Sequence, residues 1–357
     1  MAPAKQRPFR IGDTKVPAGG WTDVMLKISE TYTGAPVSLP TRVFHAEEKG
    51  PAVFLIAAVH GDEINGIGII RELFFEPLKL TRGTLICVPV ANIFGFESHS
   101  RYLPDRRDLN RSFPGNTTGS LALRLAGILF KEVISRCQYG IDLHTATIRR
   151  TNFPHIRADF SHPEVRRIAY AFGCEVILDG VGPQGSLRWE AVKSGCSVIN
   201  FEAGESFKFE PGPIRLGVRG VKNVLRELKM IEGRIVKPAY QTSAKKTTWI
   251  RSPAGGILRF HVSPGDVIDE GTHIATCDRL YSNDATPVHS QVGGVVIGMS
   301  TLPAVKPGEP VCHIAVPERP LDEIRAELAS AGKTLHRRLK RDLATNMMVE
   351  ESDTEAG

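Results

Sequence analysis

The sequence predicts an α/β fold: a three-layer domain built on a mainly parallel sheet, followed by a smaller all-β domain. Continuous apolar runs, typical of strands buried on both faces, alternate with stretches of helical period. From about residue 236 the pattern changes to short β-type runs separated by Gly- and Pro-rich turns. Ionisable residues also follow directly on several predicted strands, where open α/β sheets gather their ligand sites.

The α/β domain is expected over residues 41–235, after an N-terminal β segment at 1–40. Its strands are predicted at 52–59 (AVFLIAAV), 85–90 (LICVPV), 139–143 (YGIDL), 174–178 (CEVIL) and 197–201 (SVINF). Residues spaced for one apolar side predict helices between them, at 64–74, 121–134 and 221–230.

Residues 236–316 are predicted to form the all-β domain. Two glycine-pair turns, PAGGIL and QVGGVV, lie about 38 residues apart and indicate an internal two-fold repeat. The pattern resembles the biotinyl/lipoyl hammerhead, or barrel-sandwich, fold. A carrier domain needs a lysine at its hairpin tip, and CDRLYSNDATP at 277–287 has none. We therefore expect a cap that narrows a cleft, followed at 317–357 by a terminal helix and an acidic tail, EESDTEAG.

The composition is that of an ordinary globular protein, with 41% hydrophobic and 24% charged residues in 357. No window supplies the roughly 20 consecutive apolar residues that cross a bilayer, and the first 20 residues lack the apolar core of a secretion signal. The six cysteines are scattered without a CxxC pair. We expect a cytoplasmic protein with reduced cysteines and no membrane partner.

The formal net charge of +6 does not indicate a nucleic-acid partner. Lys and Arg are spread along the chain, with no long basic run and no aromatic-basic pattern of the RNA-binding kind. A small anionic substrate explains a mild positive bias equally well. Charge alone therefore leaves the partner open.

Four ionisable residues lie at the carboxyl ends of predicted strands: His60 and Glu63 in AVHGDEINGIG, His144 in DLH, and Glu202 in NFEAGE. These ends meet at one edge of a parallel sheet. Two neutral imidazoles and one carboxylate suit a catalytic zinc ion, because they leave it net positive with an open position. His60, Glu63 and His144 are thus candidate ligands for one zinc ion per chain, whereas a lone HxxE match is usually a surface or cap feature.

Two aspartates accompany these candidates. Asp62 is expected to accept hydrogen bonds from N–H groups at the start of the following helix. Asp142 lies two residues before His144 and therefore on the same face of its strand. It is predicted either to hold the second nitrogen of a metal-bound histidine or to make a buried structural hydrogen bond.

A long polar segment, VPVANIFGFESHSRYLPDRRDLNRSFPGN at residues 88–116, follows a predicted strand, as substrate-binding loops do. Its guanidinium groups can bind a carboxylate or an oxyanion in bidentate fashion, and the alternative is a solvated basic loop. DLNRSFPG favours the first interpretation because it sets its polar residues in a turn ending in Pro114 and Gly115. The candidate residues are Arg101, Arg107 and Arg111, with Asp108 and Asn110 beside them.

HGDE, DLNRSFPG, DLHT and FEAGE, in this order, resemble the succinylglutamate desuccinylase/aspartoacylase family of the zinc carboxypeptidase superfamily, over about residues 50–316. The resemblance implies a carboxypeptidase-like fold and hydrolysis of an amide by activated water. It also implies the roles of individual residues: zinc ligands His60, Glu63 and His144; general acid/base Glu202; carbonyl-polarising Arg101; substrate-carboxylate pair Asn110 and Arg111; and supporting positions Asn92 and Asp108.

The substrate implied is a small N-acyl amino acid or a related N-acylated amine, and the acyl group stays open. Arg149, Arg150 and Arg157 either contact its carboxylate or are surface charges, and Tyr281 is a candidate pocket residue from the β domain. One alternative is a carboxypeptidase-like enzyme that trims peptides or polyglutamate tails. Another is a noncatalytic metal-binding interaction protein, which would need neither Glu202 nor Arg101. A homo-oligomer is a further expectation.

Overall fold

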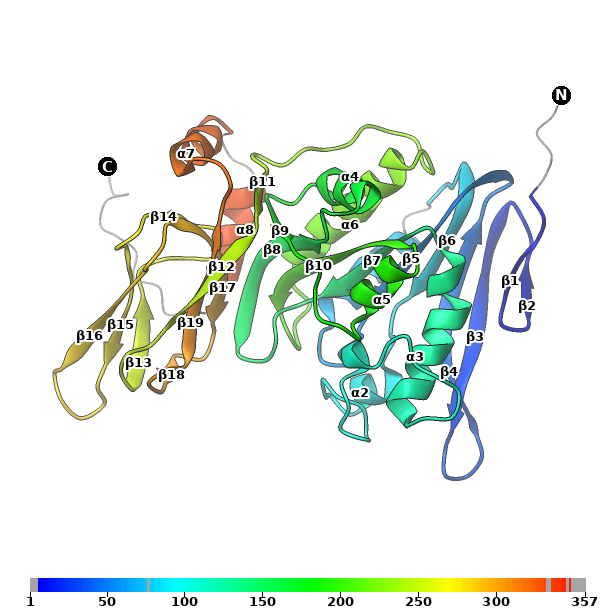
Figure 1. The fold of residues 1–357 in the computed structure, drawn as a ribbon, viewed down its shortest axis with the longest axis horizontal. Helices are drawn as coiled ribbons and strands as arrows, with labels where there is room; N and C mark the ends of the chain where they lie inside the picture. Colours follow the sequence, from blue (N-terminus) through cyan, green and yellow to red (C-terminus); the bar gives the residue numbers. More distant parts are fainter. Residues whose placement is uncertain (1–5, 76–77, 332–334, 345–346, 348–357) are drawn as a thin grey trace.

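One large sheet runs through the molecule (Figure 1). The computed structural model describes residues 6–75, 78–331, 335–344 and 347. In this part of the chain the sheet has 13 strands. Their order in space is β12 (Lys246–Arg251), β19 (Pro310–Val316), β17 (Gly294–Ser300), β8 (Arg150–Ala158), β10 (Ser197–Glu205), β7 (Tyr139–His144), β5 (Glu48–Ala57), β6 (Arg82–Val88), β4 (Pro36–His45) and β3 (Gly20–Glu30), with β9 (Val176–Asp179), β11 (Thr242–Ala244) and β14 (Val267–Ile268) paired beside this path.

The centre of the sheet is parallel, as predicted. Strands β6, β5, β7 and β10 are paired in parallel, and residues 52–57 of β5 are buried without alternation because both faces are covered. Toward both ends the pairings become antiparallel, from β3 to β6 and from β10 through β8, β17 and β19 to β12. The whole sheet is therefore mixed, and β3 shows the alternating burial of a sheet with one open face.

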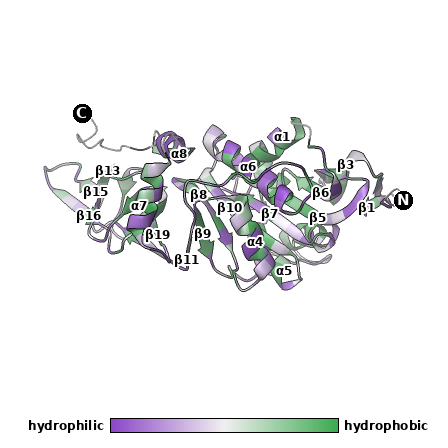
Figure 2. Ribbon diagram, turned by 90° about the horizontal axis from the view of Figure 1, so that it is seen from above, coloured by the Kyte–Doolittle hydropathy of each residue, from purple (hydrophilic) through white to green (hydrophobic). Residues whose placement is uncertain are grey.

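Helices cover both faces of the central sheet, which gives the three layers (Figure 2). On one face α1 (Asn65–Phe75), α4 (Pro163–Phe172), α6 (Pro211–Glu227) and α8 (Leu335–Ala344) contribute to one core, which includes Ile70, Phe172 and Phe201. On the other face α3 (Leu121–Glu132) and α5 (Leu187–Lys193) share a second core with Phe54. The short helix α2 (Ile93–Glu97) packs against this second core.

Several predicted boundaries were wrong. The strand expected to end at residue 59 ends at Ala57, since Ala58 has a left-handed φ of 49°. The helix expected at 221–230 begins ten residues earlier, at Pro211, where a proline in the first turn is compatible with helix. The single terminal helix is two helices, α7 (Leu321–Ser330) and α8. The predicted acidic tail lies outside the described residues.

The strands after residue 236 are divided between two sheets. Strands β12, β17 and β19 extend the large sheet, while β16 (Ala285–His289), β15 (His273–Asp278), β13 (Gly256–Phe260) and β18 (Ala304–Val305) form a separate antiparallel sheet with its own core. Both glycine pairs begin strands, β13 and β17. The predicted division at residue 40 falls inside β4, and a small hairpin, β1 (Phe9–Ile11) and β2 (Thr14–Val16), precedes β3. The domain limits and the two-fold repeat stay predictions.

This topology brings the carboxyl ends of three strands to one edge of the sheet. Strands β5, β7 and β10 are parallel neighbours or next neighbours, so their carboxyl ends lie together. Asn65, the first residue of α1, reinforces this edge: its amide donates to Ala203 O at 3.3 Å and to the Glu210 carboxylate at 2.8 Å, and it accepts from Glu210 N at 2.8 Å. The turn after β5 is thereby tied to the end of β10.

None of the helices within the described ranges combines the length and the apolar character that crossing a membrane requires.

Candidate metal centre and active site

The turn after β5 carries the first two predicted ligands, His60 and Glu63. Glu63 N donates to His60 O at 3.1 Å, which closes a tight turn between the strand and α1. Gly61, between the ligands, lies directly against α2: a Cβ there would lie 2.1 Å from Gly95 C and 2.2 Å from Phe96 N. The HGDE segment therefore needs a glycine because two stretches of backbone touch.

Gly61→Ala is expected to destabilise the fold by about 1–3 kcal/mol and to weaken metal binding, since the two backbones must move apart. Gly20→Ala is the matched control, because no atom lies within 4 Å of a Cβ built at Gly20. Urea unfolding of both variants measures the difference. Equal stability of the two would contradict this explanation of the motif.

His60, Glu63 and His144 converge on one point. One ligand atom of each lies within 4.8 Å of the others, and all three side chains are buried. His60 Nδ1 is 2.7 Å from Glu63 Oε1, and His144 Nδ1 is 2.8 Å from Glu63 Oε2. The two imidazole centroids are 5.1 Å apart. The structure thus brings together the three residues that the sequence predicts as ligands.

The donor set fits a zinc ion. Buried polar atoms are normally hydrogen-bonded, yet among the described residues His60 Nδ1 has no partner in hydrogen-bond geometry, although Glu63 is close. Burial lowers the pKa of His60 and His144, but neighbouring carboxylates outweigh it and hold both pKa values above the usual range. Burial raises the pKa of Glu63, and the charges of the two histidines lower it far more. The cluster therefore attracts positive charge to its centre.

Carboxylates orient the outer nitrogens of both imidazoles. Asp108 Oδ1 is 3.2 Å from His60 Nε2, and Asp142 Oδ2 is 2.8 Å from His144 Nε2. The Asp142 contact lies outside hydrogen-bond geometry, but the negative charge of Asp142 raises the pKa of His144. Asp142 is fully buried in β7. Such outer partners set the tautomer and leave each Nδ1 directed inward.

Asp142→Asn is expected to weaken zinc binding about 10- to 100-fold, because the amide no longer stabilises the ligating tautomer of His144. Asp179→Asn, a carboxylate that lines the same cavity, is the control for a simple loss of charge. Competition with a fluorescent zinc chelator measures both affinities. The same affinity in the two variants would contradict the orienting role.

Arg101 lies between Glu63, one of the candidate ligands, and Asp108, which contacts His60. Its Nη1 donates to Glu63 Oε1 at 2.9 Å and its Nη2 donates to Asp108 Oδ2 at 3.4 Å. Asn92, for which the resemblance implies a supporting position in the substrate-binding segment, is fully buried at the start of α2, where it accepts from Gly95 N and donates to the Arg101 carbonyl. It is not among the residues that line the cavity. Its contacts position the backbone of Arg101.

Asn110 and Arg111 belong to a short 3-10 helix, η1 (Leu109–Arg111), which Asp108 begins by accepting from Asn110 N at 2.8 Å. Both residues line the cavity. The Asn110 side chain is buried and accepts from Leu187 N at 2.8 Å, whereas Arg111 is exposed and its Nη1 donates to the Asn110 carbonyl at 2.6 Å.

Glu202 lies on β10 in register with His144 on the adjacent parallel strand. Its Oε2 accepts from Asn152 Nδ2 at 3.2 Å, and its Oε1 is 3.4 Å from Arg157 Nε. The strand is irregular between Glu202 and Gly204. Glu202 therefore lines the same cavity as the metal cluster, on a fixed strand and with two polar partners.

A cavity of about 400 Å³ joins these groups. Its cations outnumber its carboxylates: the lining includes Arg101, Arg111, Arg150, Arg157, Arg188 and Lys245, against Glu63, Asp179 and Glu202. Residues that the sequence did not single out also line it, namely Asn152, Arg188, Trp249 and His313. Burial, followed by the charge of Arg157, lowers the pKa of Arg188 to about 10, which marks a cation short of counter-charge.

Other candidates lie elsewhere. Tyr281 is fully exposed near the β15–β16 hairpin and does not line this cavity, so its tentative assignment to the pocket was wrong. Arg107 and Arg149 are likewise absent from the lining, while Arg150 and Arg157 are part of it. Asp62 Oδ1 is buried and has no hydrogen-bond partner among the described residues, so this oxygen does not cap a helix.

Solved structures share this fold. The product-bound ectoine utilization protein EutE (DoeB) from Ruegeria pomeroyi superimposes with a TM-score of 0.75 at 20% identity, covering 88% of this chain and 100% of that one. A succinylglutamate desuccinylase/aspartoacylase from Rhodobacter sphaeroides gives a TM-score of 0.71 at 22% identity, covering 83% and 96%.

Sequence comparison agrees. N-alpha-acetyl-L-2,4-diaminobutyric acid deacetylase of Halomonas elongata is 25% identical over 333 residues, which are 88% of this chain and 97% of that protein. Residues 49–228, half of the chain, match the succinylglutamate desuccinylase/aspartoacylase catalytic domain, and they contain the ligand cluster, Arg101 and Glu202. The chain therefore belongs to the succinylglutamate desuccinylase/aspartoacylase family.

Proposed function

We propose that this protein hydrolyses the amide bond of an N-acyl amino acid or a related small N-acylated amine, with one zinc ion per chain. The observation that carries the proposal is the meeting of two sets of groups in one cavity: the buried cluster His60, Glu63 and His144, and the carboxylate of Glu202. Family membership and the relative's name as a deacetylase support the same reaction class.

His60 Nδ1, the Glu63 carboxylate and His144 Nδ1 are the atoms that would hold the ion. Bound there, zinc supplies Lewis-acid chemistry, which polarises an amide carbonyl and acidifies water. The protein's own contribution is to keep the three ligand atoms together and to orient the imidazoles through Asp108 and Asp142.

Glu202 moves the proton. Its carboxylate accepts a proton from the attacking water and returns it to the amide nitrogen, which leaves as an amine. Asn152 Nδ2 and Arg157 Nε contact the carboxylate at 3.2 and 3.4 Å, so its orientation is fixed before the substrate binds. The products are a carboxylic acid and a free amine.

Arg101 supplies positive charge to the carbonyl oxygen as it becomes an oxyanion. Its guanidinium lies against Glu63 and lines the cavity, which suits this role. Arg111 and Asn110 are the proposed partners of a substrate carboxylate, and the surplus of cations in the cavity favours an anionic substrate.

A small substrate suits the site better than a protein chain. Residues of the C-terminal strands, including Trp249 and His313, form part of the cavity wall, and the volume of about 400 Å³ suits a small acylated amino acid. A scaffold without activity would need neither Glu202 nor Arg101 in this cavity. Cytoplasmic location and homo-oligomer formation stay predictions.

The test is amine release from N-acetyl, N-formyl and N-succinyl amino acids and from short peptides, with zinc-loaded protein. Turnover of an acyl amino acid, with one amine and one carboxylic acid formed per amide, is the expected result. Turnover of peptides alone would favour the carboxypeptidase alternative. No turnover of any compound, despite bound zinc, would favour the noncatalytic alternative.

A further inference from the structure

The cavity continues from the metal site along a row of side chains on the sheet face. The row runs from Asn152 on β8 through Gly298 on β17 and His313 on β19 to Trp249 on β12, because these residues are successive register partners. Residues paired in register point to the same face of a sheet. Asn152, His313 and Trp249 all line the cavity, so the C-terminal strands form its far end.

Arg150, at the start of β8, has no salt-bridge partner among the described residues. Its guanidinium lies over the Trp249 ring, with Cζ 4.9 Å from the ring centroid. Within the described residues no carboxylate lies within 4 Å of it, and no hydrogen bond engages its side chain. Burial and the charge of Arg251 lower its pKa, and the charge of Glu309 offsets part of this. Stacking holds the group in place, while its N–H donors stay available.

His313 packs against Trp249, the ring over which Arg150 lies. The imidazole stacks on Trp249 with 4.2 Å between centroids and 7° between planes. It is 5% exposed, and among the described residues its Nε2 has no hydrogen-bond partner. Burial and the charges of Arg157 and Arg150 lower the pKa of His313 to about 3, so the ring stays neutral at physiological pH. The neutral imidazole can donate an N–H to the same group that binds the Arg150 guanidinium.

We propose that the far end of the cavity, where Arg150 lies on the Trp249–His313 stack, is an anion-binding subsite that recognises the end of the substrate remote from the scissile amide. This inference rests on the proposed function, and it adds a requirement on the substrate. The remote group is a carboxylate or a similar anion, and a cationic group there is disfavoured by Arg150 and Arg157.

Gly298 lies between Asn152 and His313 in this row. A Cβ at this position would lie 3.1 Å from Asn152 Oδ1 and 3.4 Å from His313 Cβ, filling the space between the Glu202 partner and the aromatic stack. Glu202, Asn152, His313 and Arg150 all line one cavity, so one ligand can extend from the catalytic groups to Arg150.

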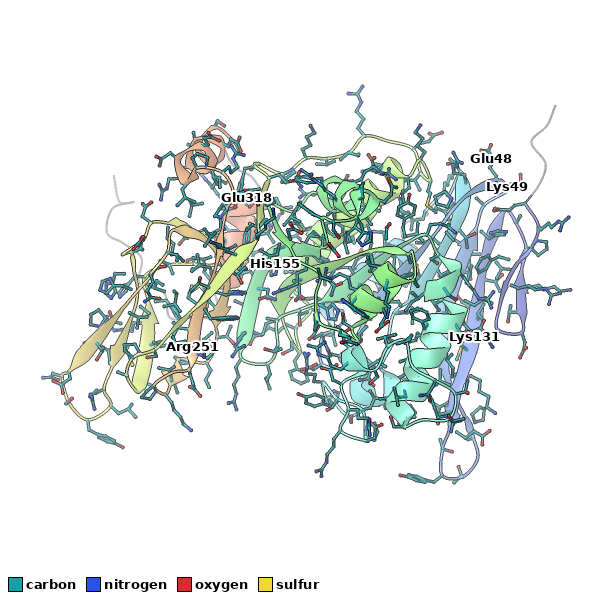
Figure 3. The ribbon with its side chains drawn as sticks, in the orientation of Figure 1. Glu48, Lys49, Lys131, His155, Arg251 and Glu318 are labelled. Carbon is teal, nitrogen blue, oxygen red and sulfur yellow. The ribbon has the colours of Figure 1, made fainter. Side chains whose placement is uncertain are left out.

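The test uses substrate pairs that differ only in remote charge. N-acetyl-L-glutamate and N-acetyl-L-glutamine place the charge on the amine side; N-succinyl-L-alanine and N-succinamyl-L-alanine place it on the acyl side. The wild type is expected to prefer the acid in one pair by about 10- to 100-fold in kcat/KM. Arg150→Gln is expected to abolish this preference. Arg251→Gln is the matched control, since this neighbouring arginine is exposed and bonds to the Gly308 carbonyl (Figure 3).

An unchanged preference in Arg150→Gln, or no preference for the acid in either pair by the wild type, would overturn the subsite. Calorimetric titration with glutarate separates this outcome from failure of the deacylase proposal. If no amide is hydrolysed but glutarate binds at least tenfold more weakly to Arg150→Gln than to Arg251→Gln, the subsite stands and the proposed reaction does not. Equal glutarate binding by the two variants would overturn the subsite.

Discussion

Glu202→Gln is expected to lower kcat by about 10²- to 10⁴-fold while zinc still binds, because the amide can neither accept a proton from water nor return it to the leaving amine. Glutamine keeps the size of the side chain, but its single amide oxygen can accept from only one of the two donors, Asn152 Nδ2 and Arg157 Nε. The zinc content of the purified variant and its rate of amine release are the two measurements.

Glu72→Gln, on the exposed surface of α1, is the control for the loss of one carboxylate. It is expected to retain wild-type activity. If Glu202→Gln kept more than about half of the wild-type kcat, the proton-transfer role would have to be assigned to another group.

His144→Ala is expected to abolish stoichiometric zinc binding, because it removes one of three converging ligand atoms. The thermal stability of the protein reports this independently of activity. A ligand that binds only the folded state at 100 times its Kd stabilises it by about 2.7 kcal/mol. Added zinc should therefore raise the Tm of the wild type and leave the Tm of His144→Ala unchanged.

His162→Ala is the matched control, since His162 is an exposed histidine that does not line the cavity. Its zinc-dependent rise in Tm should equal that of the wild type. An equal rise in His144→Ala would show that zinc binds elsewhere.

The sequence predicted that His60, Glu63 and His144 come together, because each of these candidate ligands follows a feature that can be recognised locally. His60 and Glu63 follow a buried apolar run, His144 ends another and Glu202 lies in a third. Parallel pairing then brings such strand ends together without further information. Asp142 could be assigned for the same reason, since alternation along a strand places it on the same face as His144.

At the far end of the cavity only Arg150 was a candidate from the sequence, because the rest depends on tertiary contacts between distant segments. Trp249 and His313 reach the site only because β12 and β19 join the large sheet, whereas the pattern after residue 236 indicated a separate β domain. Arg188 lies on a two-turn helix that follows a Gly-rich stretch, where no helical period is visible. A single arginine such as Arg188 cannot be assigned to a binding site from the sequence, because its burial is not known there.

The length of α6 illustrates a second limit. Its first turns, PGPIRLG, contain two prolines and two glycines, which disfavour helix in isolation. The prolines occupy the first turn, where they cost no hydrogen bond, and the glycines allow close packing: Gly217 lies against Ile69 of α1. Tertiary packing thus overrode a local preference.

The most direct test of this account is a zinc titration of metal-free protein, with release of amine from an N-acyl amino acid followed at each addition. Activity is expected to be absent without metal, to rise in proportion to added zinc and to reach a plateau at one zinc per chain. Activity that is present without metal and does not change with zinc would contradict the assignment of His60, Glu63 and His144 as the catalytic metal site.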